Sequence, residues 1–321
     1  MADTVPRTSP VRRAGHRVPS APARPARRRR TSAQNPLWAL VFIGPTALGL
    51  AVFYIWPALQ TLYYSFTTWG AFGGHTWSGL DNYTELAHDP EVATAFVNTF
   101  WYAVLGLLGI PIALTLAAAL NGPGRRGVST YRTLMFLPVV TMPAAVAIIW
   151  RWLYNGDYGL INYLLSIVGI QGTHWISNPR TALACVAAVG IWSTIGYNMV
   201  ILMAGLKAIS PHYYEAAAMD GAGPVRQFFS ITIPLLSPSL FFVTVLSVIG
   251  SLQTFDLVYV MIGRTNPALP QTRTVVYLFY QKAFIENDRG YAAALAFVLL
   301  LVIIAVTGLQ FRLQRRWVHY E

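Results

Sequence analysis

Three side chains able to bind a polar ligand lie close together in an otherwise apolar segment: Gln253, Asp256 and Tyr259. If the segment is one helix, a spacing of three residues places them along the same face. An ionisable side chain in a membrane-length segment is costly and by default faces the bundle interior or a wet cavity. A second apolar segment adds Asn198 and the ring of Tyr197. Amides, a carboxylate and flat rings suit a hydroxyl-rich ligand, so Asn198, Gln253, Asp256 and Tyr259 are candidates for a ligand path.

A structural role for these groups stays open beside the ligand interpretation. Asp256 is also placed to form a hydrogen bond between helices, or to pair with Arg151 or Arg264. Arg264 and Arg273 suit the steering of an anionic solute or an acidic partner, although we favour solvated loop charges.

The remaining reactive residue types form no recognisable constellation. His75, His88 and His174 lack metal-site spacing, and the single cysteine, Cys185, lies in an apolar segment where it is expected to be a small packing residue. We find no G-x-x-x-x-G-K-[ST] phosphate loop and no nucleophile–base pair. The sequence therefore predicts no catalytic residue, no metal and no bound cofactor, and any ATP used must be bound by another chain.

The elements that must position these groups are membrane spans. Of the 321 residues, 55% are hydrophobic and only 11% are charged, against about 25% charged in soluble domains. Continuous apolar blocks of membrane length favour an all-α integral membrane protein over a β-barrel. Six transmembrane helices are expected, at about 37–65, 94–120, 131–153, 181–206, 238–262 and 290–311.

Basic residues predict the orientation. The segment 1–35 is rich in Arg and Pro and poor in large apolar residues, so we expect a disordered cytoplasmic tail that touches anionic lipid rather than nucleic acid. The membrane domain would then span 36–321. Placing both termini in the cytoplasm puts most of the 23 basic residues inside, as the positive-inside rule requires. The outer loops 66–93, 154–180 and 263–289 are expected to form small folded caps.

The loop 207–237, on the cytoplasmic side in this orientation, has the pattern of two short helices joined by a turn. Ser210 and Pro211 are a helix-start signal, and the alanines that follow raise helix propensity. Gly221 fits the left-handed residue that ends a helix. A second helix is expected to follow, and Pro234 is expected either to stop it or to begin the turn into the fifth span. Phe228, Phe229 and Ile231 are expected to pack against the spans. The first helix presents a small alanine face that permits close approach by a partner.

The same loop resembles the signature of the membrane subunits of bacterial ABC importers, E-A-A, three residues, G, nine residues, I-x-L-P. The matching residues are Glu215, Ala216, Ala217, Gly221, Ile231 and Pro234, with Ile233 in place of the usual leucine. Asp220, Ala222, Phe228 and Pro238 fit an extended form that is typical of the sugar-type branch, the family of the maltose and glycerol-3-phosphate importers.

The resemblance covers essentially everything after residue 36. Phe255–Met261 and Gly290–Arg316 resemble the same branch, as do "LPVVTMPAAVAIIWRWLY" and "GLINYLL". The chain departs from the pattern after Met261, where a Gly-rich segment is common and this sequence has Gly263–Pro267. The pair Phe255–Asp256 is a frequent family feature, which favours a shared structural role for Asp256.

The resemblance implies a type I ABC importer permease fold in the bacterial cytoplasmic membrane. It implies a heterodimer with a homologous second permease, two ATPase subunits that bind ATP and Mg, and an extracytoplasmic solute-binding protein. The loop would be a coupling helix that docks on an ATPase subunit through Glu215–Gly221.

A di- or oligosaccharide is the solute that the resemblance favours. Glycerol 3-phosphate or a glycerophosphodiester is the alternative, although the basic residues of the 263–289 loop are not clearly in a cavity. A secondary transporter is less favoured because the halves show no convincing repeat. A membrane enzyme or receptor is disfavoured because the spans hold no nucleophile–base pair.

Overall fold

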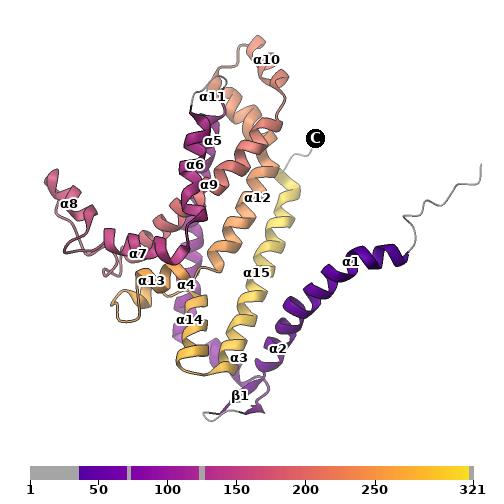
Figure 1. Ribbon diagram of the computed structural model, residues 1–321, viewed down its shortest axis with the longest axis vertical. Coiled ribbons are helices and arrows are strands. Elements are labelled where there is room, and N and C mark those ends of the chain that lie inside the picture. The colour runs from indigo at the N-terminus through magenta and orange to yellow at the C-terminus, as the bar shows by residue number, and fades with distance from the viewer. Residues whose placement is uncertain (1–35, 71–73, 123–126, 318–321) are drawn as a thin grey trace, which may run out of the picture. The chain divides into compact units, whose positions relative to one another are not determined.

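The computed structural model describes residues 36–70, 74–122 and 127–317, and it gives no side-chain description for 36–40, 316 and 317. The predicted tail 1–35 and the basic residues Arg125 and Arg126 therefore lie outside the described residues. By its internal contacts the chain divides into two compact units, one ending at Ile55 and one beginning at Trp56. Within the described ranges the secondary structure is helical apart from one two-stranded hairpin (Figure 1).

Helices long and apolar enough to cross a membrane confirm the predicted helical membrane fold. Five pass this test on their own: Val41–Tyr64, Pro90–Leu120, Ala182–Ala208, Pro224–Leu252 and Arg289–Arg315. A bent pair, Val128–Val140 with Pro143–Leu153, supplies the sixth. In order the spans comprise α1 (Pro36–Leu50), η2 (Ala51–Ile55) and α2 (Trp56–Tyr64); α4 (Pro90–Leu107) and α5 (Gly109–Leu120); α6 (Val128–Val140) and α7 (Pro143–Leu153); α9 (Ala182–Ala208); α11 (Pro224–Gln227), η3 (Phe228–Thr232) and α12 (Ile233–Leu252); and α15 (Arg289–Trp317).

The third span is not the single helix predicted over 131–153. α6 and α7 meet at a bend of 98°. Met142, with φ −57° and ψ 125°, has left the helical conformation, as expected of a residue that precedes a proline, and Pro143 then opens α7 at its first position. The proline therefore turns the chain inside the span.

The fifth span also differs from its predicted range of 238–262. It begins at Pro224, because α11, η3 and α12 follow one another without a turn. Contrary to expectation, Pro234 therefore neither stops the helix nor begins a turn. A π-helical turn precedes it, in which the Ile233 N–H donates to the Phe228 carbonyl five residues back, and such turns accommodate local disruption of the helical ladder.

The C-terminal end of the fifth span breaks before the three residues that were predicted to share one helical face, Gln253, Asp256 and Tyr259. α12 ends at Leu252 and a short helix, α13 (Asp256–Met261), follows after a three-residue link. The Thr254 carbonyl in this link accepts a hydrogen bond from the Thr274 hydroxyl at 2.9 Å. This contact comes from a distant segment, which a local pattern does not reveal.

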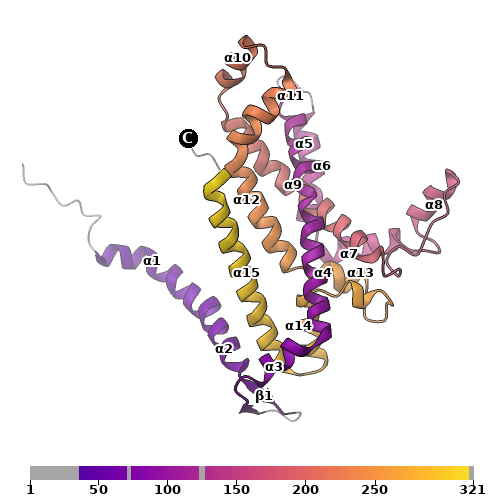
Figure 2. The same ribbon diagram turned by 180° about the vertical axis from the view of Figure 1, so that it is seen from behind.

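Short elements occupy the loops 66–93, 154–180 and 263–289, in which small folded caps were expected. They are β1 (Thr67–Trp69), β2 (His75–Trp77), α3 (Asp81–His88), α8 (Leu160–Ile167), η4 (Leu269–Gln271), α14 (Val275–Tyr280) and η5 (Gln281–Ile285). The helix–turn–helix adds α10 (Pro211–Met219). The two strands pair antiparallel, with Thr67 opposite Trp77. Both views place α10 and α11 at one end of α12 and α15, and α3, β1 and α14 at the other (Figures 1 and 2).

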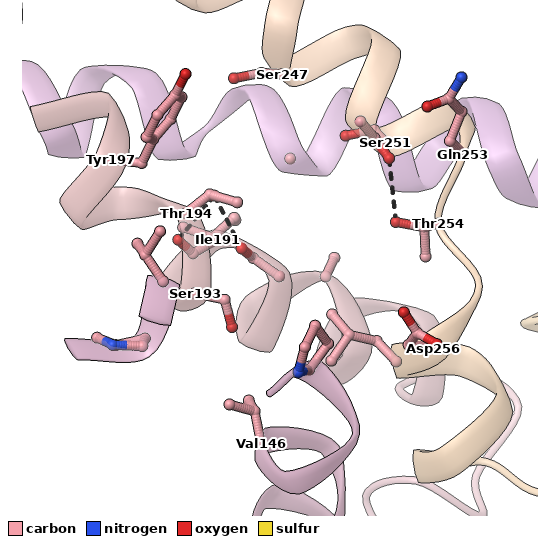
Figure 3. Close-up of a pocket in the computed structure, with 18 of the residues that line it drawn as sticks. Val146, Ile191, Ser193, Thr194, Tyr197, Ser247, Ser251, Gln253, Thr254 and Asp256 are labelled. Atoms are coloured by element: carbon pink, nitrogen blue, oxygen red, sulfur yellow. Dashed lines mark hydrogen bonds between the residues drawn. The ribbon is translucent and has the colours of Figure 1, made fainter. Parts of the chain in front are cut away.

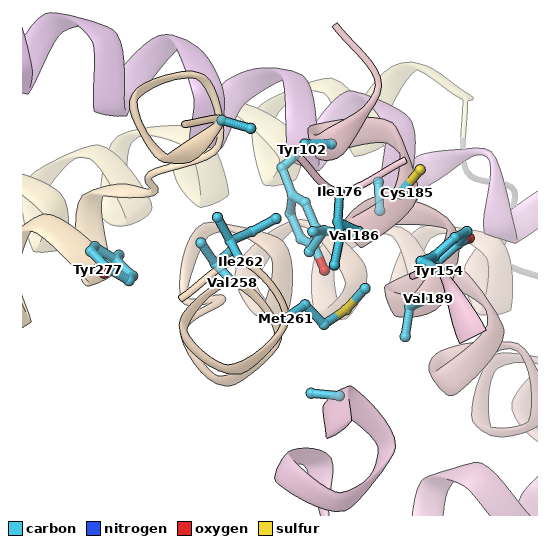
Figure 4. Packing of buried hydrophobic residues seen from close by; sticks show 14 of the residues in the cluster. Tyr102, Tyr154, Ile176, Cys185, Val186, Val189, Val258, Met261, Ile262 and Tyr277 are labelled. Atoms are coloured by element: carbon cyan, nitrogen blue, oxygen red, sulfur yellow. The ribbon is translucent and has the colours of Figure 1, made fainter. Parts of the chain in front are cut away.

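The core of the second unit is built around α9, which packs against α4, α5, α6 and α12. Gly196 allows α6 to come close, because a side chain there would strike the Met135 carbonyl. One buried cluster joins α4, α7, α9 and α13 through residues such as Tyr102, Val186 and Met261 (Figure 4). Cys185 is buried in this cluster, which confirms its packing role.

Candidate functional site

A polar cavity of about 460 Å³ lies between α4, the α6–α7 bend, α9 and α12. Its labelled polar side chains come from α9 on one side and from α12 and the segment after it on the other (Figure 3). The polar residues of the wall are Tyr102 from α4; Thr141 from the α6–α7 bend; Ser193, Thr194, Tyr197 and Asn198 from α9; Ser247 and Ser251 from α12; Gln253 and Thr254 from the link; and Asp256 from the start of α13. The two breaks in the spans create this site, because the α6–α7 bend and the α12–α13 link both contribute wall residues.

The cavity wall carries one charged side chain, and it is acidic. Asp256 is the single acidic residue among the lining residues, all of which are described, and none of them is Lys or Arg. Asp256 is exposed and makes no ion pair within the described chain. The buried Ser193 hydroxyl has no hydrogen-bond partner there either. A neutral ligand rich in hydroxyl groups would match these acceptors and donors, whereas an anion would face a carboxylate.

The structure brings together three of the four predicted path residues. Asn198, Gln253 and Asp256 line the cavity, although the prediction that Gln253, Asp256 and Tyr259 share one helical face is wrong because the helix breaks between the first two. Tyr259 lies elsewhere, stacked on Phe255 with ring centroids 5.1 Å apart.

The ion-pair alternative for Asp256 finds no support in the described residues. Neither Arg151 nor Arg264 forms an ion pair with it. Arg151 instead donates from Nη1 to the Val260 carbonyl at 3.4 Å.

Sequence reasoning missed the serine and threonine residues of the cavity: Thr141, Ser193, Thr194, Ser247, Ser251 and Thr254. One signal was available, since Ser247 and Ser251 are four residues apart and so lie on one face of α12. Which spans face each other was not visible in the sequence.

The helix–turn–helix α10–α11 is the second candidate site. Ser210 occupies the N-cap position and Pro211 opens α10, but the Ser210 hydroxyl makes no capping hydrogen bond. Gly221 is left-handed, with φ 77°, and the Ala222 N–H donates to the Ala217 carbonyl at 2.9 Å. This pattern closes the helix end as predicted.

A hydrogen bond to the start of the fifth span fixes this loop, while most of its side chains are exposed. The Tyr214 hydroxyl hydrogen-bonds the Thr232 hydroxyl of η3 at 3.0 Å. No residue of α10 is buried, and Glu215 and Asp220 are exposed. Ile231 and Pro234, the later signature residues, are half-buried at the base.

Large apolar side chains stand exposed on the same loop. Met219 is 82% exposed and Val225 71% exposed. Phe229, expected to pack against the spans, is 63% exposed, whereas Phe228 does pack against the core. Exposed apolar residues grouped on an ordered loop mark an interaction site.

At the opposite end of the bundle, Arg273 is not the solvated loop charge that we expected. It is 7% exposed and pairs with Glu91 at 2.9 Å. Arg264, by contrast, is exposed and makes no ion pair within the described chain. The two arginines therefore differ, although they lie in the same loop.

A second ion pair lies beside them, between Lys282 and Glu286 at 2.9 Å. Burial alone would lower the pKa of Lys282, but the hydrogen bond and charge of Glu286 outweigh it and raise that pKa. Burial would likewise raise the pKa of Glu286, but hydrogen bonds from Lys282 and Gln281 lower it. Both groups therefore stay charged at neutral pH.

A polar cavity inside a bundle of spanning helices is the architecture of a membrane transport subunit. The family model of binding-protein-dependent transport system inner membrane components matches residues 109–319. The chain belongs to this family, and the resemblance to ABC importer permeases is confirmed. It is thus a multi-span inner-membrane component that works with a binding protein and other subunits.

Individual relatives agree with this assignment. The chain is 36% identical to the probable ABC transporter permease protein YesP of Bacillus subtilis (strain 168), over 91% of this chain and 95% of that protein. It is 35% identical to the sn-glycerol-3-phosphate transport system permease protein UgpA of Yersinia enterocolitica, over 84% and 92%. These relatives are permease subunits, in which nucleotide hydrolysis belongs to partner chains.

A solved structure has the same fold. A chain of a bacterial alginate ABC transporter, crystallised with a periplasmic protein carrying an alginate pentasaccharide, matches with a TM-score of 0.76 and 20% sequence identity. The match covers 88% of this chain and 94% of that one.

Proposed function

We propose that this chain is the translocation subunit of an ATP-driven importer for a neutral di- or oligosaccharide. The observation that carries the proposal is the cavity wall, which offers hydroxyls, amides and one carboxylate but no basic side chain. Sugar hydroxyls both donate and accept hydrogen bonds, so they can satisfy Asp256, Asn198 and the unpartnered Ser193. The rings of Tyr197 and Tyr102 supply apolar surface in the same wall.

The α10–α11 loop is the proposed contact with an ATPase subunit. Its support is the combination of a fixed backbone, through Gly221 and the Tyr214–Thr232 hydrogen bond, with exposed Glu215, Met219 and Phe229. Because α11 continues directly into α12, which lines the cavity, a displacement of the loop would reach Ser247 and Ser251 along one continuous helix.

In the proposed assembly the chain pairs with a homologous second permease, two ATPase subunits that hold ATP and Mg, and a solute-binding protein outside the membrane. Both termini and the α10–α11 loop then face the cytoplasm. The support is the distribution of basic residues in the sequence together with the position of the loop at the end of the bundle opposite α3 and α14 (Figure 1).

Glycerol 3-phosphate or a glycerophosphodiester is the second candidate solute. One observation favours it, namely that several relatives near 35% identity are glycerol-3-phosphate permeases. The lack of a basic residue in the cavity wall argues against it, since Arg and Lys side chains commonly hold phosphate.

The test is ligand-stimulated ATPase activity of the reconstituted complex with its own binding protein, across a panel of di- and oligosaccharides and glycerol 3-phosphate. Stimulation by a neutral sugar is expected. Stimulation by glycerol 3-phosphate alone would replace the first proposal with the second.

A further inference from the structure

A second polar hollow, the arginine pocket, lies outside the cavity. It has a volume of about 260 Å³ and is lined by Arg264, Leu269, Arg273, Tyr277, Tyr280, Gln281, Ile285 and Glu286. Its walls come from the α13–α14 loop, α14 and η5. It shares no lining residue with the polar cavity.

Four packed aromatic rings, those of Phe255, Tyr259, Tyr277 and Tyr280, lie between the polar cavity and the arginine pocket. Phe255 lines the cavity, whereas Tyr277 and Tyr280 line the arginine pocket. Phe255 and Tyr259 both lie 5.1 Å from Tyr280, centroid to centroid. The Tyr259 and Tyr280 hydroxyls are 3.4 Å apart. A group bound in the arginine pocket is therefore separated from the cavity by packed rings.

The hydrogen bonds of the pocket are incomplete at Arg273. Its Nη2 donates to Glu91 at 2.9 Å, and its Nη1 donates to the Gln281 side-chain oxygen at 3.3 Å. The Nε–H is buried and has no partner in the described chain. A buried donor left unpaired costs free energy, so the hydrogen bonds of this guanidinium group are not all satisfied by the described residues.

The charge of the pocket favours an anion. The positive charge of Arg273 is neutralised by Glu91, and the negative charge of Glu286 is neutralised by Lys282. Arg264 has no such partner among the described residues, so it gives the pocket one net positive charge. Burial raises the pKa of Tyr277, and the charges of Arg264 and Arg273 oppose that rise. Both guanidinium groups therefore act on the interior of the pocket.

We propose that the arginine pocket binds one oxyanion group, a carboxylate or a phosphate, between the guanidinium groups of Arg264 and Arg273. A guanidinium group binds such groups with short charge-assisted hydrogen bonds. The oxyanion is either a free inorganic ion or the charged end of a larger solute. This site does not depend on the class of solute that the cavity accepts.

The test uses the full-length chain in detergent and follows its thermal unfolding while sodium phosphate replaces sodium chloride at constant ionic strength. Ligand that binds the folded state raises the unfolding temperature in a saturable way. Phosphate also stabilises proteins without binding, so the criterion is the saturable part of the shift. We expect Arg264→Gln to raise the dissociation constant about fivefold or more, because it removes the unpaired charge.

Two further variants separate a site from a general loss of stability. Glu286→Gln removes the carboxylate that faces the oxyanion, so the dissociation constant should fall by a factor of about two to five. Arg180→Gln deletes an exposed arginine that does not line the pocket and should change nothing. Ser193→Ala and Asp256→Asn alter only the cavity and should also leave the constant unchanged, so a failure of the proposed function would not affect this result.

Matched solutes identify the source of the oxyanion. Equal saturable shifts with phosphate and glycerol 3-phosphate would assign the pocket to a free ion. A shift with glycerol 3-phosphate or glucuronate, but not with phosphate, glycerol or glucose, would assign it to a larger anionic solute. The proposal is overturned if none of the three anions gives a saturable shift, or if Arg264→Gln binds as tightly as the wild type.

Discussion

The polar cavity collects its side chains from α9, α12 and the α12–α13 link, whereas the α10–α11 loop is one continuous stretch of chain. The cavity is partly open and is lined by several neighbouring helices, and its hydroxyl-bearing residues come from different segments of the chain. The loop exposes Glu215, Met219 and Phe229 and fixes its shape with one left-handed glycine. Changes in the loop should therefore affect the contact with partner chains, while changes in the cavity should affect the solute.

The largest effect is expected at Gly221. Its φ of 77° is unfavourable for a β-branched residue, so Gly221→Val should distort the end of α10 while the chain still assembles in the membrane. Uptake by the reconstituted complex should fall to background while ATP hydrolysis persists. Gly223→Ala is the matched control, because Gly223 has φ −69° and open space around its Cα. Normal uptake by an assembled Gly221→Val complex would show that the shape of the α10–α11 loop is not needed for coupling. It would contradict the separate roles assigned to the loop and the cavity.

A large effect on stability is expected where α6 meets α9. A methyl group at Gly196 would strike the Met135 carbonyl, so Gly196→Ala should destabilise the bundle by about 1–3 kcal/mol. Thermal unfolding of the purified chain measures this loss. Gly250→Ala, which meets open space, should be neutral or slightly stabilising, and equal behaviour of the two variants would contradict the packing described for α9.

A moderate effect is expected for solute affinity. Asp256→Asn and Gln253→Ala should each raise the half-saturating solute concentration about fivefold, since each removes roughly one net hydrogen bond of about 1 kcal/mol. The measurement is concentration-dependent uptake into proteoliposomes. Tyr259→Phe is the control, because the Tyr259 hydroxyl lies outside the cavity wall. If both cavity variants keep wild-type affinity and rate, those side chains are structural.

The smallest effect concerns pH. The lowered pKa of Glu286 means that its ion pair stabilises the fold above the unfolded-state value near 4.5 and is lost as pH falls through the folded-state pKa. The pair is partly exposed, so its contribution is below about 1 kcal/mol. Thermal unfolding between pH 7 and pH 4 should show a slightly smaller loss of stability for Glu286→Gln than for the wild type. Glu85→Gln, at an exposed residue, is expected to match the wild type.

The same contrast explains what could be predicted from the sequence. The α10–α11 turn follows from adjacent residues, so Pro211 and Gly221 were sufficient to locate it. The span positions followed from hydropathy over about twenty residues. Pro143 was available as a break signal in the third span, but proline also occurs inside membrane helices, as Pro138 does in α6.

The cavity was only partly predictable because it depends on which helices face one another. Asn198, Gln253 and Asp256 were found as rare polar residues in apolar segments. The hydroxyl residues were missed, since Ser and Thr in a span commonly satisfy their own backbone, as Thr194 does at Gly190. The burial of Arg273 depends on Glu91, 182 positions earlier in the chain, and no local pattern shows that pair.

The central claim is that the α10–α11 loop contacts an ATPase subunit whereas the cavity does not. Its most direct test is cross-linking in the assembled complex, with the native Cys185 replaced by alanine. A cysteine introduced at Ala218→Cys, which is exposed on α10, should give a thiol-specific product joining this chain to an ATPase subunit, while Thr194→Cys in the cavity should not. Absence of the Ala218→Cys product from a complex that hydrolyses ATP and imports solute would contradict the account.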